Sequence, residues 1–366
     1  MPGNLRRKIL KNLGLTRLKR EASSDSNLSG TGVVNHDERS LCKQSTHNGT
    51  YPRLTRLSDG AILASFTRWE GDMRILCITR STDEGKSFVE IGEVTRRRSD
   101  TDNLFLIEVA PAVVLAAFRN HDLGPGPDGF THFRITVCKS VDGGRTWTYL
   151  SQAAEKSPPF GIWEPFMRIG KEGELQLIFS QEFAYDDQRT MMVVSRDQGR
   201  TWTKPICIEG WKEKLRDGMT GIAATKDNGR DALVMVFETT RHGPFSIEAV
   251  VSYDDGKTWR HRDEVYVPKP GRNAGAPQIA SYADGSMVVV FMTDEDAEKV
   301  EWTRNASIKA VFAGPLRNGK THWSKATLVS PPSSFWPGIM ALDGYTALAT
   351  YEHHGPRGKT ITWCPK

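Results

Sequence analysis

The chain has 366 residues, of which 38% are hydrophobic and 25% are charged, and it holds 10 tryptophans and 33 glycines. This composition supports a sizeable core, and the lack of any apolar run of about 18 residues excludes a transmembrane helix. The first 20 residues contain seven Lys and Arg and no Asp or Glu, so residues 21–366 carry a net charge of 5 − 7 = −2. A body this close to neutral argues against a nucleic-acid partner.

The segment before residue 41 differs in composition from the rest of the chain. Residues 4–20 are compatible with a basic, Arg-rich amphipathic helix of the kind found in transit peptides. The favoured interpretation is a disordered basic tail, followed by a Ser- and Gly-rich linker near residues 23–32. No apolar signal-peptide core is present, so the sequence as written indicates a cytoplasmic protein.

A short pattern, Ser-x-Asp-x-Gly-x-Ser/Thr-Phe/Trp, occurs four times, starting at Ser81, Ser140, Ser195 and Ser252, with spacings of 59, 55 and 57 residues. A degenerate fifth copy lies at residues 318–323. Such a period indicates a repeat architecture, and the pattern is the Asp box. Its Asp can accept bonds from backbone N–H groups of its own turn, and its Gly permits a positive φ. We therefore expect a rigid corner between two strands, with the last aromatic in the core and no catalytic residue.

A second repeat, which reads strand, turn, strand, lies between the boxes. Its hairpin signals include Asp-Gly turns at residues 59–60, 284–285 and 343–344. The six copies lie at residues 51–66, 103–118, 163–179, 219–237, 276–291 and 336–351. With two outer strands per copy joined by an Asp box, they predict an all-β, sialidase-like six-bladed β-propeller over residues 41–366, preceded by a tail and linker at 1–40. A strand near Leu41 is expected to complete the last blade.

The five cysteines contain no C-x-x-C pair, which argues against a zinc site. Cys42 and Cys364 flank the folded body, and a disulfide between them at the ring closure would require an oxidising compartment. No His or Cys spacing supports any other metal ligand set, and no cofactor is expected.

The innermost strands of a propeller surround its axis, so the starts of first strands and the ends of second strands should gather at one mouth, opposite the Asp boxes. This mouth is rich in carboxylates, arginines and aromatics, which suits sugars because aromatic faces stack on C–H surfaces and carboxylates bind hydroxyls. The residues assigned to substrate binding are Arg53, Arg119, His121, Trp163, Glu182, Arg241, Gln278, Trp336, Tyr351 and Glu352.

Two carboxylates are candidates for catalysis. Glu164 opens the first strand of the third unit, and Glu238 follows the aromatic that ends the second strand of the fourth. A separation of about 5–5.5 Å would support retaining glycoside hydrolysis, and one of about 6.5–9.5 Å would support inversion. In the alternative interpretation each glutamate is the ion-pair partner of Arg53, Arg119 or Arg241 in a binding or structural mouth.

The Asp boxes and Tyr51-Pro52-Arg53 resemble the sialidase superfamily, in which an arginine of the first strand meets the substrate. More closely, residues 51–54 (Tyr-Pro-Arg-Leu), 161–166 (Gly-Ile-Trp-Glu-Pro-Phe) and 236–238 (Val-Phe-Glu) resemble glycoside hydrolase family 93. The resemblance covers nearly all of residues 45–366.

Family 93 enzymes are exo-α-1,5-L-arabinanases that release arabinobiose with retention from a six-bladed propeller. The resemblance implies an oligo- or polysaccharide substrate, with Glu164 as acid/base and Glu238 as nucleophile. The apolar wall of Trp163 and Phe166 would raise the pKa of the acid. Members of the family are usually secreted, whereas this sequence shows no signal peptide. We expect a monomer.

Two other functions remain open. A sialidase needs three arginines around a carboxylate, for which Arg53, Arg241 and either Arg272 or Arg304 are available. It also needs a tyrosine nucleophile, and sialidases resemble one another in placing it at the start of the last unit, where this chain has residues 335–337 (Phe-Trp-Pro). A non-catalytic propeller that binds glycans or proteins would have the same fold. Hydrolysis of an arabinan-type polysaccharide is the favoured prediction.

Overall fold

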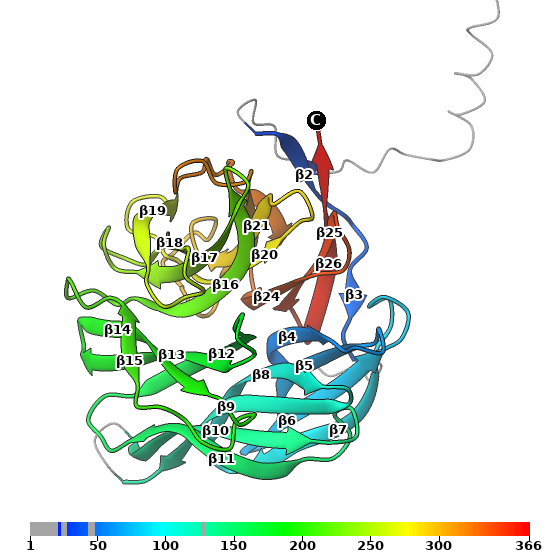
Figure 1. Ribbon diagram of the computed structural model, residues 1–366, viewed down its shortest axis with the longest axis vertical. Helices are drawn as coiled ribbons and strands as arrows, with labels where there is room; N and C mark the ends of the chain where they lie inside the picture. Colours follow the sequence, from blue (N-terminus) through cyan, green and yellow to red (C-terminus); the bar gives the residue numbers. More distant parts are fainter. Residues whose placement is uncertain (1–20, 23–27, 43–47, 126–128) are drawn as a thin grey trace, which may run out of the picture.

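The computed structural model describes residues 21–22, 28–42, 48–125 and 129–366. These residues form six antiparallel sheets, which follow one another around a ring in the order of the sequence (Figure 1). The predicted six-bladed, all-β propeller is therefore confirmed. None of the described elements is a helix that could cross a membrane.

Five blades have four strands in sequence order, from the innermost strand outward. The first blade holds β4 (Thr50–Arg56), β5 (Ile62–Glu70), β6 (Met73–Ser81) and β7 (Val89–Arg97). The second holds β8 (Asp100–Ala110), β9 (Val113–Leu123), β10 (Phe130–Ser140) and β11 (Thr148–Lys156). The third holds β12 (Ile162–Ile169), β13 (Leu175–Ala184), β14 (Asp187–Ser195) and β15 (Ile206–Glu209). The fourth holds β16 (Gly218–Asp227), β17 (Arg230–Thr239), β18 (Ser246–Ser252) and β19 (Arg260–Tyr266). The fifth holds β20 (Ala274–Ser281), β21 (Met287–Thr293), β22 (Ser307–Ala313) and β23 (Thr327–Ser330).

The sixth blade joins the two ends of the described chain. Its strands β24 (Phe335–Ala341), β25 (Thr346–Glu352) and β26 (Pro356–Pro365) are completed by β2 (Gly30–Val34), with β1 (Glu21–Ala22) on β2 and β3 (Arg39–Ser40) on β26. The closing pairs run from Gly30↔Pro365 to Val34↔Ile361. The expected strand beside Leu41 is present as β3, which pairs with the start of β26, but β2 pairs with the rest of β26, so strand pairing begins earlier than the start at residue 41 suggested by the sequence. The helix or tail expected within residues 1–20 lies outside the described residues.

Small residues allow the closing strand to pack tightly. A Cβ on Gly32 would lie 2.2 Å from the ring of Phe312, and one on Gly30 would lie 2.5 Å from the indole of Trp363. Cys42 and Cys364 form no disulfide: Cys42 is buried in a cluster with Phe66 and Cys77, whereas Cys364 is exposed on β26.

The Asp boxes form the predicted corners between the third and fourth strands of their blades. In the first box, Asp83 accepts hydrogen bonds from the backbone N–H groups of Lys86 (3.1 Å) and Ser87 (3.0 Å) and from the hydroxyl of Ser87 (2.6 Å). The hydroxyl oxygen of Ser81 accepts a further bond from the backbone N–H of Gly85 (2.9 Å). The bonds from Ser87 hold the pKa of Asp83 at about 2. One feature was not predicted: the residue before the glycine also has a positive φ, as at Glu84 (57°).

Replacing Asp83 with Ala is expected to destabilise the propeller by about 1–2 kcal/mol, because several turn donors lose their acceptor at once. Denaturant unfolding followed by tryptophan fluorescence measures the change. Asp186→Ala, at an exposed aspartate in the β13–β14 turn, is the matched control. Equal midpoints for the two variants would show that the box does not stabilise the corner.

All six innermost strands share a β-bulge near their N-terminal ends. The strand register shifts there in β4, β8, β12, β16, β20 and β24. Each bulge contains one non-glycine residue with φ between 44° and 55°; these residues are Tyr51, Asn103, Glu164, Met219, Ala276 and Trp336. A bulge bends its strand and redirects a side chain, and strained backbone of this kind gathers at functional sites. The six bulges therefore form a ring at one end of the propeller axis.

Candidate active site

A cavity of about 250 Å³ opens at the ring of bulges, and both predicted catalytic glutamates line it. Its walls come from five of the six blades and consist of Tyr51, Trp163, Glu164, Glu182, Gln188, Arg216, Met219, Glu238, Trp302 and Trp336. Glu164 and Glu238 are 74 positions apart in the chain, and the convergence of β12 and β17 on the axis brings them to one cavity.

Glu164 occupies the bulge of β12, with a φ of 44°, and is half-buried. Burial and the nearby carboxylate of Glu238 raise its pKa to about 8, although Arg119 and a bond from Ser180 act in the opposite direction. Desolvation and a like charge both penalise the ionised form of a carboxyl group. Glu164 therefore carries a proton near neutral pH.

Glu238 lies near the end of β17, and only 6% of the residue is exposed. Its Oε2 accepts a hydrogen bond from the backbone N–H of Ala276 (2.8 Å). Burial raises the pKa of Glu238 to about 7, while the Ala276 bond and the charge of Arg216 favour ionisation. A Cβ on Gly275 would lie 2.4 Å from this oxygen, so the absence of a side chain at Gly275 leaves room for the carboxylate beside β20.

Arg216 is a cavity residue that the sequence analysis missed. Its guanidinium donates to Glu182 Oε1 (2.7 Å), to Gln188 Oε1 (2.9 Å) and to the carbonyl of Tyr185 (3.0 Å). Burial would raise the pKa of Glu182, but the bonds from Arg216 and from Gly161 N outweigh it and lower the pKa. The cavity therefore holds a fixed ion pair beside the two glutamates with raised pKa values.

Aromatic rings form the other walls. Trp336 stacks on Tyr51 with ring centroids 4.6 Å apart. Trp163 packs so closely on Gly161 that a Cβ there would lie 2.4 Å from the indole. Trp302, also unforeseen, comes from the loop between β21 and β22 and stacks with Phe245 at 6.0 Å. These flat faces suit the C–H surfaces of a sugar ring.

Arg53 and Gln278 lie in a smaller chamber of about 20 Å³, which Glu164 and Met219 also line. Arg53 Nη1 donates to the carbonyls of Pro52 (3.0 Å), Trp336 (3.3 Å) and Pro337 (2.9 Å), and burial lowers its pKa to about 10. Gln278 Nε2 donates to the carbonyl of Pro277 (2.8 Å). Both side chains thus bond to the backbone of the inner strands, next to the cavity.

Arg119 does not line the cavity, although its charge acts on Glu164. Its Nη2 lies 3.2 Å from Asp100 and 3.4 Å from Asp102, and its guanidinium sits 5.6 Å from the ring centroid of Trp163. Arg74 pairs with the same two aspartates. Arg119 is thus part of a buried ion-pair network that supports the cavity wall.

Four further residues predicted to bind substrate do not line the cavity. His121 is fully buried, its Nδ1 accepts from Arg134 N (3.1 Å), and burial lowers its pKa to about 4. Tyr351 is also fully buried and donates its hydroxyl to Glu38 (2.8 Å).

Arg241 pairs with Glu213 (2.8 Å) and Glu248 (3.0 Å), on the outer side of the fourth blade. The pKa of Glu352 is raised by burial, against a bond from Thr50. Strand alternation accounts for only one of the neighbours Tyr351 and Glu352 on β25, and Arg241 lies beyond the end of β17.

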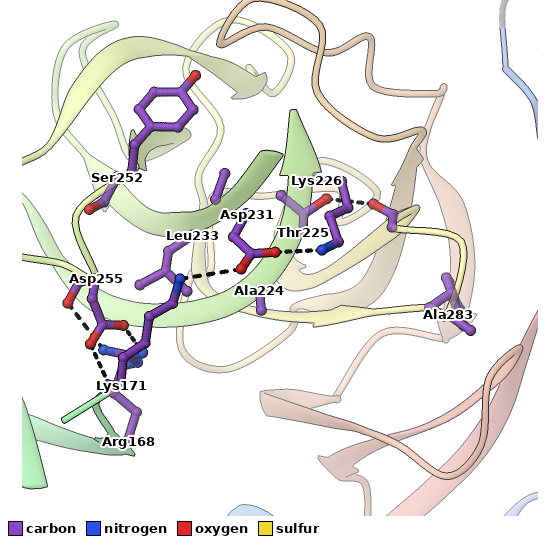
Figure 2. Close-up of a pocket in the computed structure, with 14 residues that line it drawn as sticks. Arg168, Lys171, Ala224, Thr225, Lys226, Asp231, Leu233, Ser252, Asp255 and Ala283 are labelled. Atoms are coloured by element: carbon purple, nitrogen blue, oxygen red, sulfur yellow. Dashed lines mark hydrogen bonds and ion pairs between the residues drawn. The ribbon is translucent and has the colours of Figure 1, made fainter. Parts of the chain in front are cut away.

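A larger cavity of about 320 Å³ lies at the opposite, Asp-box end, between the third, fourth and fifth blades. Its charged residues neutralise one another: Lys171 and Lys226 pair with Asp231, and Arg168 pairs with Asp255 (Figure 2). The bonds from Lys226 and Lys171 lower the pKa of Asp231. Its larger volume therefore does not mark it as the reactive site.

The described residues contain no group of three or more His, Cys, Asp or Glu side chains arranged to hold a metal ion.

The sequence matches no protein-family model and no curated protein. Solved structures are similar in fold. The GH93 alpha-L-arabinofuranosidase of Fusarium graminearum in complex with arabinobiose has a TM-score of 0.65 at 17% identity, over 89% of this chain and 96% of that chain. The alpha-L-arabinanase of Penicillium chrysogenum, complexed with arabinobiose, has a TM-score of 0.59 at 17% identity, over 86% and 93%.

The NanB sialidase of Streptococcus pneumoniae is also similar, with a TM-score of 0.57 at 12% identity, over 87% of this chain and 68% of that chain. At these identities the likeness establishes the propeller fold that the three proteins and this chain share.

Proposed function

We propose that the protein is a retaining glycoside hydrolase that acts on an arabinan-type polysaccharide. The observation that carries the proposal is the cavity at the ring of bulges. Glu164 and Glu238 both line it, each with a raised pKa, and aromatic rings form its other walls. Retaining glycoside hydrolysis requires two carboxyl groups whose surroundings differ, so that one is protonated while the other is ionised.

The surroundings of the two glutamates suggest their roles. Glu238 receives the Ala276 N–H and the charge of Arg216, both of which favour its ionised form. Glu164 is pushed further toward the protonated form, partly by the charge of Glu238 itself. A single proton shared by the pair therefore resides on Glu164. This assigns Glu164 as general acid/base and Glu238 as nucleophile.

The reaction then proceeds in two steps. Glu164 donates its proton to the glycosidic oxygen while a Glu238 oxygen attacks the anomeric carbon, so the glycosidic C–O bond breaks and a glycosyl ester forms. Glu164, now ionised, removes a proton from water as the water attacks the same carbon and the ester bond breaks. Two displacements at one carbon retain its configuration, and they require the carboxyl groups to lie about 5–5.5 Å apart.

The choice of substrate rests on the aromatic walls and on the fold neighbours. The Fusarium and Penicillium proteins were solved with arabinobiose. Here Trp163, Trp302 and the Tyr51–Trp336 stack offer flat apolar faces around the two glutamates. We therefore place an arabinofuranosyl unit in this cavity; exo action on α-1,5-linked arabinan is what the resemblance of residues 161–166 and 236–238 to family 93 implies.

The geometry does not favour the sialidase alternative. Its expected arginine grip does not form: Arg53 bonds to carbonyls, Arg241 pairs with Glu213, and Arg272 donates to the carbonyls of Asp294 (3.3 Å) and Glu298 (3.2 Å). Neither these three residues nor Arg304 lines the cavity that holds the two glutamates.

The test is incubation of the full chain with debranched arabinan, linear arabino-oligosaccharides and a sialoside, with products separated by chromatography. Release of a short arabino-oligosaccharide is expected. Its newly formed reducing end should have the α configuration in NMR spectra recorded before the anomers interconvert. Hydrolysis of the sialoside alone would replace this function with a sialidase. No turnover on any substrate, combined with binding, would point to a non-catalytic propeller.

The pH dependence of kcat/KM is expected to be bell-shaped, with its maximum between about pH 7 and 8. The acidic limb arises because Glu238, with a pKa of about 7, must be ionised; the basic limb arises because Glu164, with a pKa of about 8, must be protonated. Initial rates on an aryl arabinofuranoside across pH 4–10 measure it. An optimum below pH 5 would contradict the assignment.

A further inference from the structure

The third blade carries a group of aromatic side chains beside the cavity, here called the blade-three rim: Phe160, Phe183, Tyr185 and Trp211. Tyr185 is 80% exposed, Trp211 61% and Phe183 40%. Only two other aromatic side chains among the described residues are exposed to this degree, Tyr149 and Tyr345. Exposed aromatic surface gathered at one place usually marks a binding site.

The blade-three rim lies at the end of the blade where the cavity opens. Phe160 precedes β12, Tyr185 is in the turn between β13 and β14, and Trp211 is in the link from β15 to β16. The rings of Phe160 and Tyr185 meet edge to face, with centroids 5.1 Å apart. The guanidinium of Arg189 lies 4.5 Å from the ring of Phe183 and pairs with Asp187 (2.6 Å).

Direct hydrogen bonds connect this rim to the cavity wall. Arg216 bonds to the carbonyl of Tyr185 and to the carboxylate of Glu182. The other oxygen of Glu182 accepts from the N–H of Gly161, which follows Phe160 (3.0 Å). The backbone of Tyr185, and that of Gly161 next to Phe160, are therefore bonded to the ion pair in the cavity.

We infer that the blade-three rim binds the part of a neutral polysaccharide chain that extends beyond the cavity. This inference rests on the proposed function and deepens it by naming the residues that distinguish polymer from short substrate. The occupant is a sugar chain because exposed tryptophan and tyrosine faces stack on C–H surfaces while their polar atoms reach hydroxyls. The contacts lie outside the cavity, so they affect polymer binding and leave the chemical step unchanged.

The kinetic test uses the variants Trp211→Ala and Tyr185→Ala. Each is expected to raise KM for debranched arabinan about tenfold while kcat, and kcat/KM on an aryl arabinofuranoside, stay at wild-type values. Tyr185 meets Arg216 only through its backbone carbonyl, so its truncation leaves the cavity intact. Tyr149→Ala, at a side chain that is 64% exposed on the second blade, is the matched control and should change neither constant. Unchanged KM for the polymer in both rim variants would overturn the inference.

A binding test separates failure of the rim from failure of the proposed function. Electrophoresis of the full chain through gels containing debranched arabinan or other neutral plant polysaccharides measures retardation without turnover. One outcome would refute the proposed function and support the rim. In it, the wild type hydrolyses no arabinoside but is retarded in the gel, and the retardation is abolished by Trp211→Ala and Tyr185→Ala but not by Tyr149→Ala. Wild-type migration that no polysaccharide changes, or equal retardation of rim and control variants, overturns the rim.

Discussion

Glu238→Gln is expected to lower kcat about 10,000-fold or more on every glycoside substrate, because the other ionised carboxylate of the cavity, Glu182, is held in its ion pair with Arg216 and does not replace the nucleophile. Glu164→Gln is expected to lower kcat about 100- to 10,000-fold on arabinan, since protonation of the leaving oxygen is lost. On an aryl arabinofuranoside whose leaving group needs no proton, the first step of the Glu164 variant should stay fast. The ester should then accumulate, giving a burst of released phenol.

Added azide distinguishes the two glutamates. With the Glu164→Ala variant, azide should replace water in the second step and give an arabinosyl azide of retained configuration, which NMR identifies. Glu352→Gln is the matched control, because this glutamate also has a pKa raised by burial but does not line the cavity. Wild-type turnover in both the Glu164→Gln and Glu238→Gln variants would contradict the site assignment.

Arg262→Ala is expected to destabilise the propeller by about 3–5 kcal/mol, because it leaves the buried carboxylate of Asp217 without a counter-charge and removes one of the two arginines that pair with Glu248. Arg262 contacts both oxygens of Asp217, at 2.6 and 3.1 Å, and pairs with Glu248; the exposed fractions of these acidic side chains are 0% and 2%. Arg262 also donates to Thr239 Oγ1 (3.1 Å), next in the chain to Glu238. The substitution therefore loosens the strand end that holds the proposed nucleophile.

Chemical denaturation measured on the full chain tests this expectation. Arg260→Ala, at an exposed position on the same strand, is the control and should change stability by less than about 0.5 kcal/mol. A free energy of unfolding for Arg262→Ala within that range of the wild type would show that the network contributes little.

The fold could be predicted from the sequence because its signals are local and repeated. Each Asp box satisfies its own turn, as Asp83 does with Lys86 and Ser87, so eight residues suffice to recognise a corner. The ring closure was harder to place. β26 is ten residues long, and its partner strand β2 begins at Gly30, within a segment whose Ser- and Gly-rich composition suggested a linker.

The cavity was predicted only in part, and the bulges explain why. A positive φ at Tyr51, Glu164 or Trp336 leaves no signal in the sequence, because glycine is absent there. The ends of the second strands were a separate source of error: residues there were expected at the mouth, whereas His121 on β9 and Tyr351 on β25 are fully buried. Arg216 lies in a link between blades and Trp302 in a loop, where no periodicity indicates which way a side chain points.

The most direct test of the central claim is covalent labelling of the cavity. An α-L-arabinofuranose analogue with an electrophilic epoxide or aziridine at the anomeric position should react once per chain, and peptide mass spectrometry should find the adduct on Glu238. Glu238→Gln should abolish labelling, while Glu164→Gln should slow it. An adduct on any other residue, or unchanged labelling of the Glu238 variant, would contradict the two-glutamate mechanism.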